Sequence, residues 1–158
     1  ETPAKDNAYK FFFNQVKLGK IFYFAGYMDG YYLATTEKAD KAVDVYLEAV
    51  EGKENAYLLY FMDGETKTYI EVYERTAGEA GKGKGSVRFV TTAPTNYYTI
   101  DATTGTLFHT SADGLNVYYL GTYGTYKTCS VSNASYITGY KASSVGVSQF
   151  PAGFATIL

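Results

Sequence analysis

Apolar and polar residues alternate along much of this chain with a period of two, and the longer period of an α-helix is rare. In one example, Val43, Val45 and Leu47 alternate with Asp44 and Tyr46. Side chains at every second position share one face of a strand, so the pattern predicts β-strands. Tyrosine, phenylalanine, valine, isoleucine and threonine, which favour strands, dominate these segments. We predict about twelve strands, at residues 9–16, 21–25, 31–35, 43–50, 56–61, 68–73, 86–91, 97–101, 106–110, 117–122, 126–131 and 153–158.

Turn signals separate the predicted strands, and one of them recurs. Asp-Gly readily adopts the positive φ angles of hairpin turns, and related strands follow each copy. Three such units of four strands would form a β-trefoil, a six-stranded barrel closed by three hairpins, which leaves no sheet edge exposed. The predicted fold class is therefore all-β and trefoil-like, with a β-sandwich as the alternative. The repeated turns are Asp29-Gly30, Asp63-Gly64 and Asp113-Gly114.

The length of 158 residues is typical of one domain with an ordinary core. We assign residues 9–158 to a single all-β domain and residues 1–8 to a polar leader or the boundary of a mature domain. Helical patterns are limited to single turns in residues 36–44 and 143–150. The glycine-rich segment 77–85 is either a surface insertion or a flap over a ligand. No apolar run approaches the ~20 residues of a membrane span, so none is expected.

Charge and composition argue against several functional classes. The chain has 14 basic and 16 acidic residues, so it lacks the basic excess that nucleic-acid binding requires. His109 and Cys129 are the only residues of their types, which gives no support to a zinc site and rules out an intramolecular disulfide. No Gly-x-Ser-x-Gly motif is present, and most candidate aspartates lie in turns that need them for backbone geometry. We therefore expect a protein that is not an enzyme and has no cofactor or metal.

Tyrosine is the most informative residue type, because the chain contains 18 tyrosines, 10 phenylalanines and no tryptophan. A tyrosine ring can remain half-exposed at little cost and can stack on the apolar C–H face of a pyranose. Neighbouring aspartate and lysine side chains can accept and donate hydrogen bonds to the sugar hydroxyls. Tyrosines in turns and glycine-rich loops, with the polar residues beside them, are thus the candidate ligand-binding residues: Tyr27, Asp29, Tyr97, Tyr98, Asp113, Tyr123, Tyr126 and Lys127.

Each tyrosine in this set is selected for its position along the chain. Tyr27 lies just before the first Asp-Gly turn. Tyr97 and Tyr98 are adjacent at the start of a predicted strand, so one of them should point outward. Tyr123 and Tyr126 lie in the segment 121–127, whose glycines predict a loop. We expect such loop tyrosines either to cover the sheet or to stack on a ligand.

Several segments also resemble a known kind of domain. They are residues 26–36, 42–48, 59–70, 118–126 and 148–153. Together they are similar to a module of large extracellular proteins of gut Firmicutes, and most of all to N-terminal starch-binding domains of amylosome starch adherence systems. The similarity extends over nearly the whole chain from Tyr9 onward.

The resemblance implies non-catalytic binding of starch or maltooligosaccharide, an α-1,4-glucan, at the bacterial cell surface. It also implies an extracellular location and further domains in a larger surface protein. The alternative is a structural or adhesive spacer domain that uses its tyrosines for packing or protein contacts.

Overall fold

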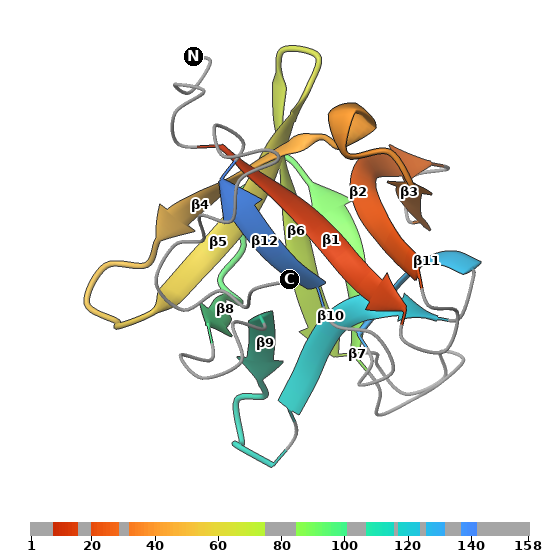
Figure 1. The fold of residues 1–158 in the computed structure, drawn as a ribbon. Coiled ribbons are helices and arrows are strands. Elements are labelled where there is room, and N and C mark those ends of the chain that lie inside the picture. Colours follow the sequence, from red (N-terminus) through yellow and green to blue (C-terminus); the bar gives the residue numbers. More distant parts are fainter. Residues whose placement is uncertain are drawn as a thin grey trace.

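The computed structural model describes residues 8–15, 20–28, 32–74, 85–100, 107–115, 117–123, 126–131 and 137–141. In these ranges the regular structure is β-sheet apart from the short 3-10 helix η3 (Ala39–Lys41), as Figure 1 shows. The strands are β1 (Tyr9–Gln15), β2 (Lys20–Met28), β3 (Tyr32–Thr36), β4 (Asp44–Ala49), β5 (Ala56–Asp63), β6 (Thr66–Glu74), β7 (Gly85–Val90), β8 (Tyr98–Ile100), β9 (Leu107–Thr110), β10 (Val117–Tyr123), β11 (Tyr126–Val131) and β12 (Ile137–Lys141).

The predicted all-β class is confirmed. Each predicted strand from 9–16 to 126–131 coincides with an observed one whose ends are shifted by a few residues, and η3 lies inside the predicted turn 36–44. The sequence pattern did not reveal β12. The predicted strand 153–158, the predicted turn 143–150 and residues 77–84 of the glycine-rich segment lie outside the described residues, and the last residue of that segment, Gly85, begins β7. The described part of the chain holds no helix with the length and apolar character that a membrane span requires.

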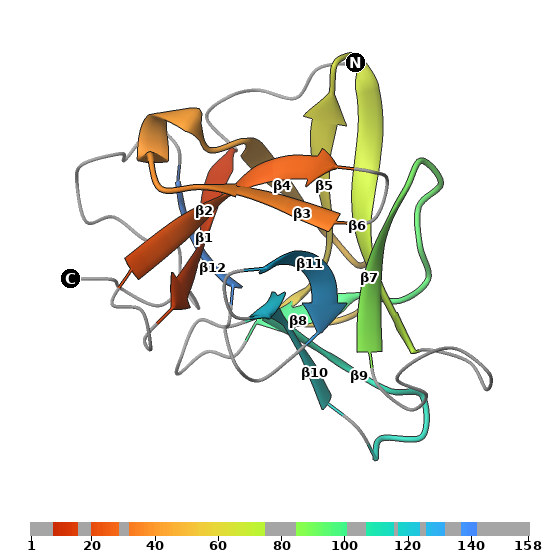
Figure 2. The same cartoon turned by 90° about the vertical axis from the view of Figure 1, so that its right-hand side faces the viewer.

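The strands form one antiparallel sheet with the order β3-β2-β1-β4-β5-β6-β7-β11-β10-β9-β8. Two pairings lie off this path, because β12 pairs with β1 and β8 also pairs with β5. Among the described strands no pairing joins β3 to the other end of the path, so the sheet as a whole is not closed. Near β3 the sheet bends back on itself, and β11 lies beside β3 without pairing to it (Figure 2).

Two of the three Asp-Gly turns are visible and form the predicted hairpins. The turn at Gly64 connects β5 to β6, and the turn at Gly114 connects β9 to β10. Both glycines have positive φ angles, 64° and 76°, which glycine adopts without steric cost. Asp29-Gly30 lies outside the described residues, but the strands on either side of it, β2 and β3, pair through Met28 and Tyr32.

A single apolar cluster fixes β2 against β5. Phe24 of β2 is fully buried and meets the ring of Phe61 of β5 edge-on, with ring centroids 5.4 Å apart. Phe61 in turn belongs to a core that includes Val45, Leu59 and Ile70. Burial of each such side chain contributes about 1.5–3 kcal/mol to folding. This core places residues near position 25 beside residues near position 62.

Tyrosines also pack on the outer face of the sheet. Tyr46, Tyr60 and Tyr69 are register partners across β4, β5 and β6, with ring centroids 5.4 Å and 5.6 Å apart. The ammonium group of Lys67 lies 4.2 Å from the Tyr60 ring centroid and 2.9 Å from a Glu48 carboxylate oxygen. Tyr46 and Tyr69 are each only 5% exposed. The high tyrosine content is therefore explained in part by packing.

Candidate functional site

A β-bulge near the end of β2 directs Tyr27 towards the core. In a regular strand Phe24 and Tyr27 would face opposite sides of the sheet, because they are an odd number of residues apart. The β2–β3 register shifts between these two residues, and Gly26 has a φ angle of 104°. A bulge of this kind reorients the side chains that follow it. Both rings consequently contact Phe61, at 5.4 Å for Phe24 and 5.9 Å for Tyr27.

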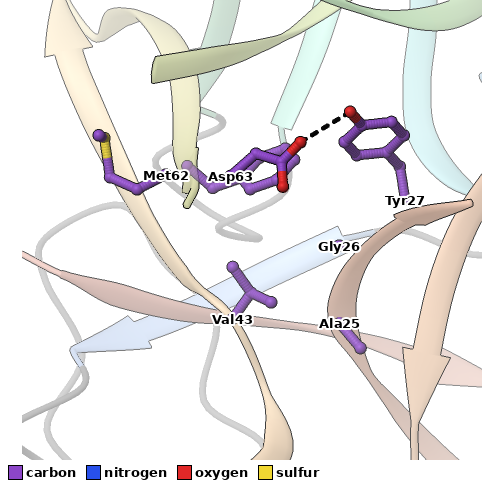
Figure 3. Close-up of a pocket in the computed structure, with 7 residues that line it drawn as sticks. Ala25, Gly26, Tyr27, Val43, Met62 and Asp63 are labelled. Atoms are coloured by element: carbon purple, nitrogen blue, oxygen red, sulfur yellow. Dashed lines mark hydrogen bonds between the residues drawn. The ribbon is translucent and has the colours of Figure 1, made fainter. Parts of the chain in front are cut away.

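The ring of Tyr27 is held by contacts from two other strands. It stacks on Phe89 of β7, with centroids 4.7 Å apart and an interplanar angle of 20°, and meets Phe61 at 63°. Its hydroxyl donates a 2.8 Å hydrogen bond to Oδ2 of Asp63, at the end of β5 (Figure 3). Aromatic pairs in these arrangements contribute about 0.5–1.5 kcal/mol beyond area burial. The ring is partly exposed, and its orientation is fixed by Phe89, by Phe61 and by the hydrogen bond at its tip.

The hydrogen bond to Asp63 raises the pKa of Tyr27 above its ordinary value of 10.0, and partial burial and the negative charge of Asp63 raise it further. Loss of the phenolic proton would remove the donor and bring two negative charges together. Tyr27 therefore stays a hydrogen-bond donor at neutral pH.

A cavity of about 410 Å³ lies between these residues, within the size range of small-molecule sites. Its walls combine apolar surface with one carboxylate, and Figure 3 shows Tyr27 and Asp63 on the side opposite Val43 and Ala25. The residues that line it are Ala25, Gly26, Tyr27, Val43, Phe61, Met62 and Asp63. We call this the Tyr27–Asp63 pocket.

The chemistry available in the Tyr27–Asp63 pocket is recognition of a molecule with both an apolar face and hydroxyl groups. A carboxylate offers about four acceptor positions, so Asp63 can accept further hydrogen bonds while it holds Tyr27. Val43, Phe61 and Met62 supply apolar wall. In the described ranges no three histidine, cysteine, aspartate or glutamate side chains are grouped as a metal site.

Comparison of the chain with protein-family models, with curated proteins and with solved structures found no match.

Of the adjacent pair Tyr97 and Tyr98, Tyr98 requires a correction to its predicted role. Tyr98 begins β8 and is 1% exposed in the hydrophobic core, so its ring has no surface to offer a ligand, and its assignment as a ligand-binding residue is wrong. Strand alternation turns Tyr97 the other way, and it is partly exposed as expected for one of the pair. The ammonium of Lys53 lies 5.4 Å from the Tyr97 ring centroid, and His109 Nδ1 is 3.0 Å from the Tyr97 carbonyl oxygen.

Asp113 is exposed in the turn between β9 and β10, where it stabilises its own backbone. Its Oδ1 accepts hydrogen bonds from the Ser111 hydroxyl at 2.6 Å and the Leu115 amide at 3.0 Å. These hydrogen bonds lower the pKa of Asp113, with that from Ser111 contributing most. The turn thus accounts for this aspartate, and its role towards a ligand stays a prediction.

The segment 121–127, predicted as a loop between the strands 117–122 and 126–131, differs from the prediction at Tyr123, which belongs to the first strand. β10 continues to Tyr123, β11 starts at Tyr126, and these two residues are register partners, with Lys127 following in β11. A register shift between Gly121 and Tyr123 explains why a glycine lies inside the strand. The described features of Tyr123, Tyr126 and Lys127 are those of the backbone, and Asp29 lies outside the described residues.

Sequence reasoning found Tyr27 but missed its partner Asp63. The Asp-Gly turn alone explained that aspartate, and the two residues are 36 positions apart in the chain. One signal was present. An aromatic residue precedes Met-Asp-Gly in both copies, as Tyr27 and as Phe61, and these two rings meet in the structure. The repeated motif therefore marks both sides of the Tyr27–Asp63 pocket.

Proposed function

We propose that this protein is a non-catalytic carbohydrate-binding domain and that the Tyr27–Asp63 pocket holds one sugar unit of its ligand. The observation that carries the proposal is the partly exposed Tyr27 ring, fixed by Phe89 and Asp63 at the edge of a cavity of about 410 Å³. Pyranose rings have an apolar C–H face and a hydroxyl rim, and this pocket presents an apolar wall beside a carboxylate.

In the proposed complex, the C–H face of a glucose ring lies against Tyr27 and the apolar wall. Asp63 accepts a hydrogen bond from a sugar hydroxyl while it continues to accept one from Tyr27. Each sugar hydroxyl exchanges a water hydrogen bond for a protein one, so the net gain is small. We expect dissociation constants on the order of micromolar to millimolar.

The choice of α-1,4-glucan, either starch or maltooligosaccharide, rests on the resemblance of segments 26–36 and 59–70 to starch-binding modules of surface proteins. These two segments contain Tyr27 and Asp63, the hydrogen-bonded pair of the pocket. On the same basis we propose an extracellular, surface-associated location and attachment to other domains of a larger protein.

We further propose a trefoil-like barrel made of β1, β4, β5, β8, β9 and β12. Five of its six neighbour pairings support this arrangement: β12–β1, β1–β4, β4–β5, β5–β8 and β8–β9. A pairing between β9 and β12 would close it, and nuclear Overhauser contacts between Leu107–Thr110 and Ile137–Lys141 would test that pairing. The hairpin partners β2–β3, β6–β7 and β10–β11 then lie outside the ring of six.

This arrangement also accounts for the unequal intervals between the Asp-Gly turns. The first turn joins the second and third strands of its group of four. The turns at Gly64 and Gly114 join the first and second strands of theirs. The three turns are consequently not equivalent positions of a threefold repeat.

Affinity electrophoresis of the chain in gels with amylopectin, pullulan, dextran or xylan tests the proposed function. We expect retardation by amylopectin alone, and we expect the Tyr27→Ala variant to lose it while Tyr73→Ala, a partly exposed tyrosine packed under Arg88, keeps it. Absence of retardation in every gel would instead favour the spacer function. Release of reducing sugar from amylopectin would identify an enzyme.

A further inference from the structure

The charge in the described lining of the Tyr27–Asp63 pocket is negative. Among its seven described lining residues, Asp63 is the one that carries a charge, and no lysine, arginine or histidine is included. Asp63 is exposed at the tip of the β5–β6 hairpin, and Glu65 is exposed in the same turn. A ligand in this pocket therefore meets a negative field.

Two cations on strands next to the pocket are engaged elsewhere. Lys67 pairs with Met62 across β5 and β6, but its ammonium lies 2.9 Å from Glu48 and over the Tyr60 ring. Strand alternation puts this cluster on the face opposite Phe61.

Lys10 is the second such cation. Its ammonium is 2.8 Å from Asp44 and donates a 2.6 Å hydrogen bond to the carbonyl oxygen of Ala42, the residue before Val43. Both ammonium groups are thus paired with carboxylates of β4, and Asp63 is the charged group in the described lining of the pocket.

We propose that the Tyr27–Asp63 pocket ranks sugars by the charge of the substituent that faces Asp63, with an amine bound more tightly than a hydroxyl and a hydroxyl more tightly than a carboxylate. This inference rests on the proposed carbohydrate-binding function and specifies the class of sugar. Its preferred ligands are neutral and amino sugars, and uronic acids bind most weakly.

Three physical effects act in the same direction. An ammonium group donates a charge-assisted hydrogen bond to a carboxylate, which is roughly twice as strong as a neutral one. The partly exposed ring of Tyr27 also attracts a cation. A sugar carboxylate, in contrast, is repelled by Asp63 and finds no cation among the described lining residues to offset that repulsion.

The experiment measures binding of methyl glycosides to the whole chain by NMR titration at low salt. The ligands are α-glucoside, its 2-amino and 6-amino analogues, and α-glucuronide. We expect the better amino analogue to bind roughly threefold to tenfold more tightly than the glucoside, and the glucuronide about tenfold more weakly or worse. The differences should shrink as salt screens the charge.

Asp63→Asn should bring the four affinities together. Asn-Gly favours the same turn as Asp-Gly, so the fold is retained. Glu65→Gln, which removes an equal charge from the same turn outside the pocket lining, is the matched control and should keep the ranking.

The two proposals fail in different ways. If the wild-type chain binds the glucoside and the glucuronide equally, the charge ranking is overturned and the carbohydrate-binding function stands. A ranking that survives in Asp63→Asn also overturns it. If neither the glucoside nor maltooligosaccharides bind at all, the proposed function itself fails.

Discussion

Removal of the Tyr27 hydroxyl tests whether its hydrogen bond to Asp63 organises the Tyr27–Asp63 pocket. Tyr27→Phe keeps the ring contacts with Phe89 and Phe61 but deletes the 2.8 Å hydrogen bond to Asp63. Hydrogen bonds to charged groups contribute about 1.5–3 kcal/mol. Asp63 is exposed, so water competes for it, and we expect a loss of about 1 kcal/mol in the free energy of unfolding. For a domain of this size that corresponds to a fall in Tm of about 2–4 °C.

A double-mutant cycle isolates this interaction from other effects of the substitutions. Urea unfolding of the wild type, Tyr27→Phe, Asp63→Ala and the double variant at neutral pH gives the coupling energy, for which we expect about 0.5–1 kcal/mol. Any effect of Asp63→Ala on the hairpin turn cancels, because it is present with and without the hydroxyl. A coupling energy of about 0.3 kcal/mol or less, within the range of independent sites, would refute the claim that this bond organises the pocket.

Three further predictions concern the scaffold. Tyr98→Ala should lower the free energy of unfolding by about 3–5 kcal/mol, as for other buried aromatic residues. Tyr97→Ala should lower it by about 1 kcal/mol or less, the size of a surface cation–π contact. Similar losses of stability for the two variants in urea unfolding would contradict the difference in burial. Burial raises the pKa of Glu48, but hydrogen bonds from Lys67 and Tyr69 and the Lys67 charge outweigh it and hold the pKa below 4.5. The stability contributed by that carboxylate should be present above pH 4.5 and lost as the pH falls through the lowered pKa, and Glu48→Gln should weaken this dependence in unfolding measurements from pH 7 to 3. Gly26→Ala should lower the free energy of unfolding by about 1–3 kcal/mol, because alanine is strained at a φ angle of 104°. The added Cβ would not clash, since it would lie 3.9 Å from Val43, an ordinary contact distance. An unchanged Tm would contradict this prediction.

Local patterns were sufficient to predict most of the strands, because alternation and Asp-Gly turns act over a few residues. β12 was missed since Gly139 interrupts its short run and its stabilising partner, β1, lies far away in the chain. Alternation also predicted that Tyr97 and Tyr98 point in opposite directions. It did not predict which of the two is buried in the core. That choice depends on the pairing of β8 with β5 and β9, which no local pattern encodes.

The sequence predicted one of the two residues that form the hydrogen bond at the candidate site. The position of Tyr27 before a turn identified it, but its ring direction follows from the Gly26 bulge, and its hydrogen bond follows from the packing of β2 against β5. Asp63 was assigned to its turn alone, yet it serves the turn and the pocket together. In the segment 121–127 the sequence did not assign Tyr123 to the strand, because a glycine at a register shift looks the same in sequence as a glycine in a turn.

The central claim is that the ring of Tyr27 binds a saccharide, and isothermal titration with a maltooligosaccharide tests it most directly. We predict that the wild type and Tyr73→Ala bind with similar affinity, and that Tyr27→Ala loses at least tenfold, or about 1.4 kcal/mol, with its far-UV circular dichroism unchanged. Wild-type affinity in a folded Tyr27→Ala variant would contradict the claim.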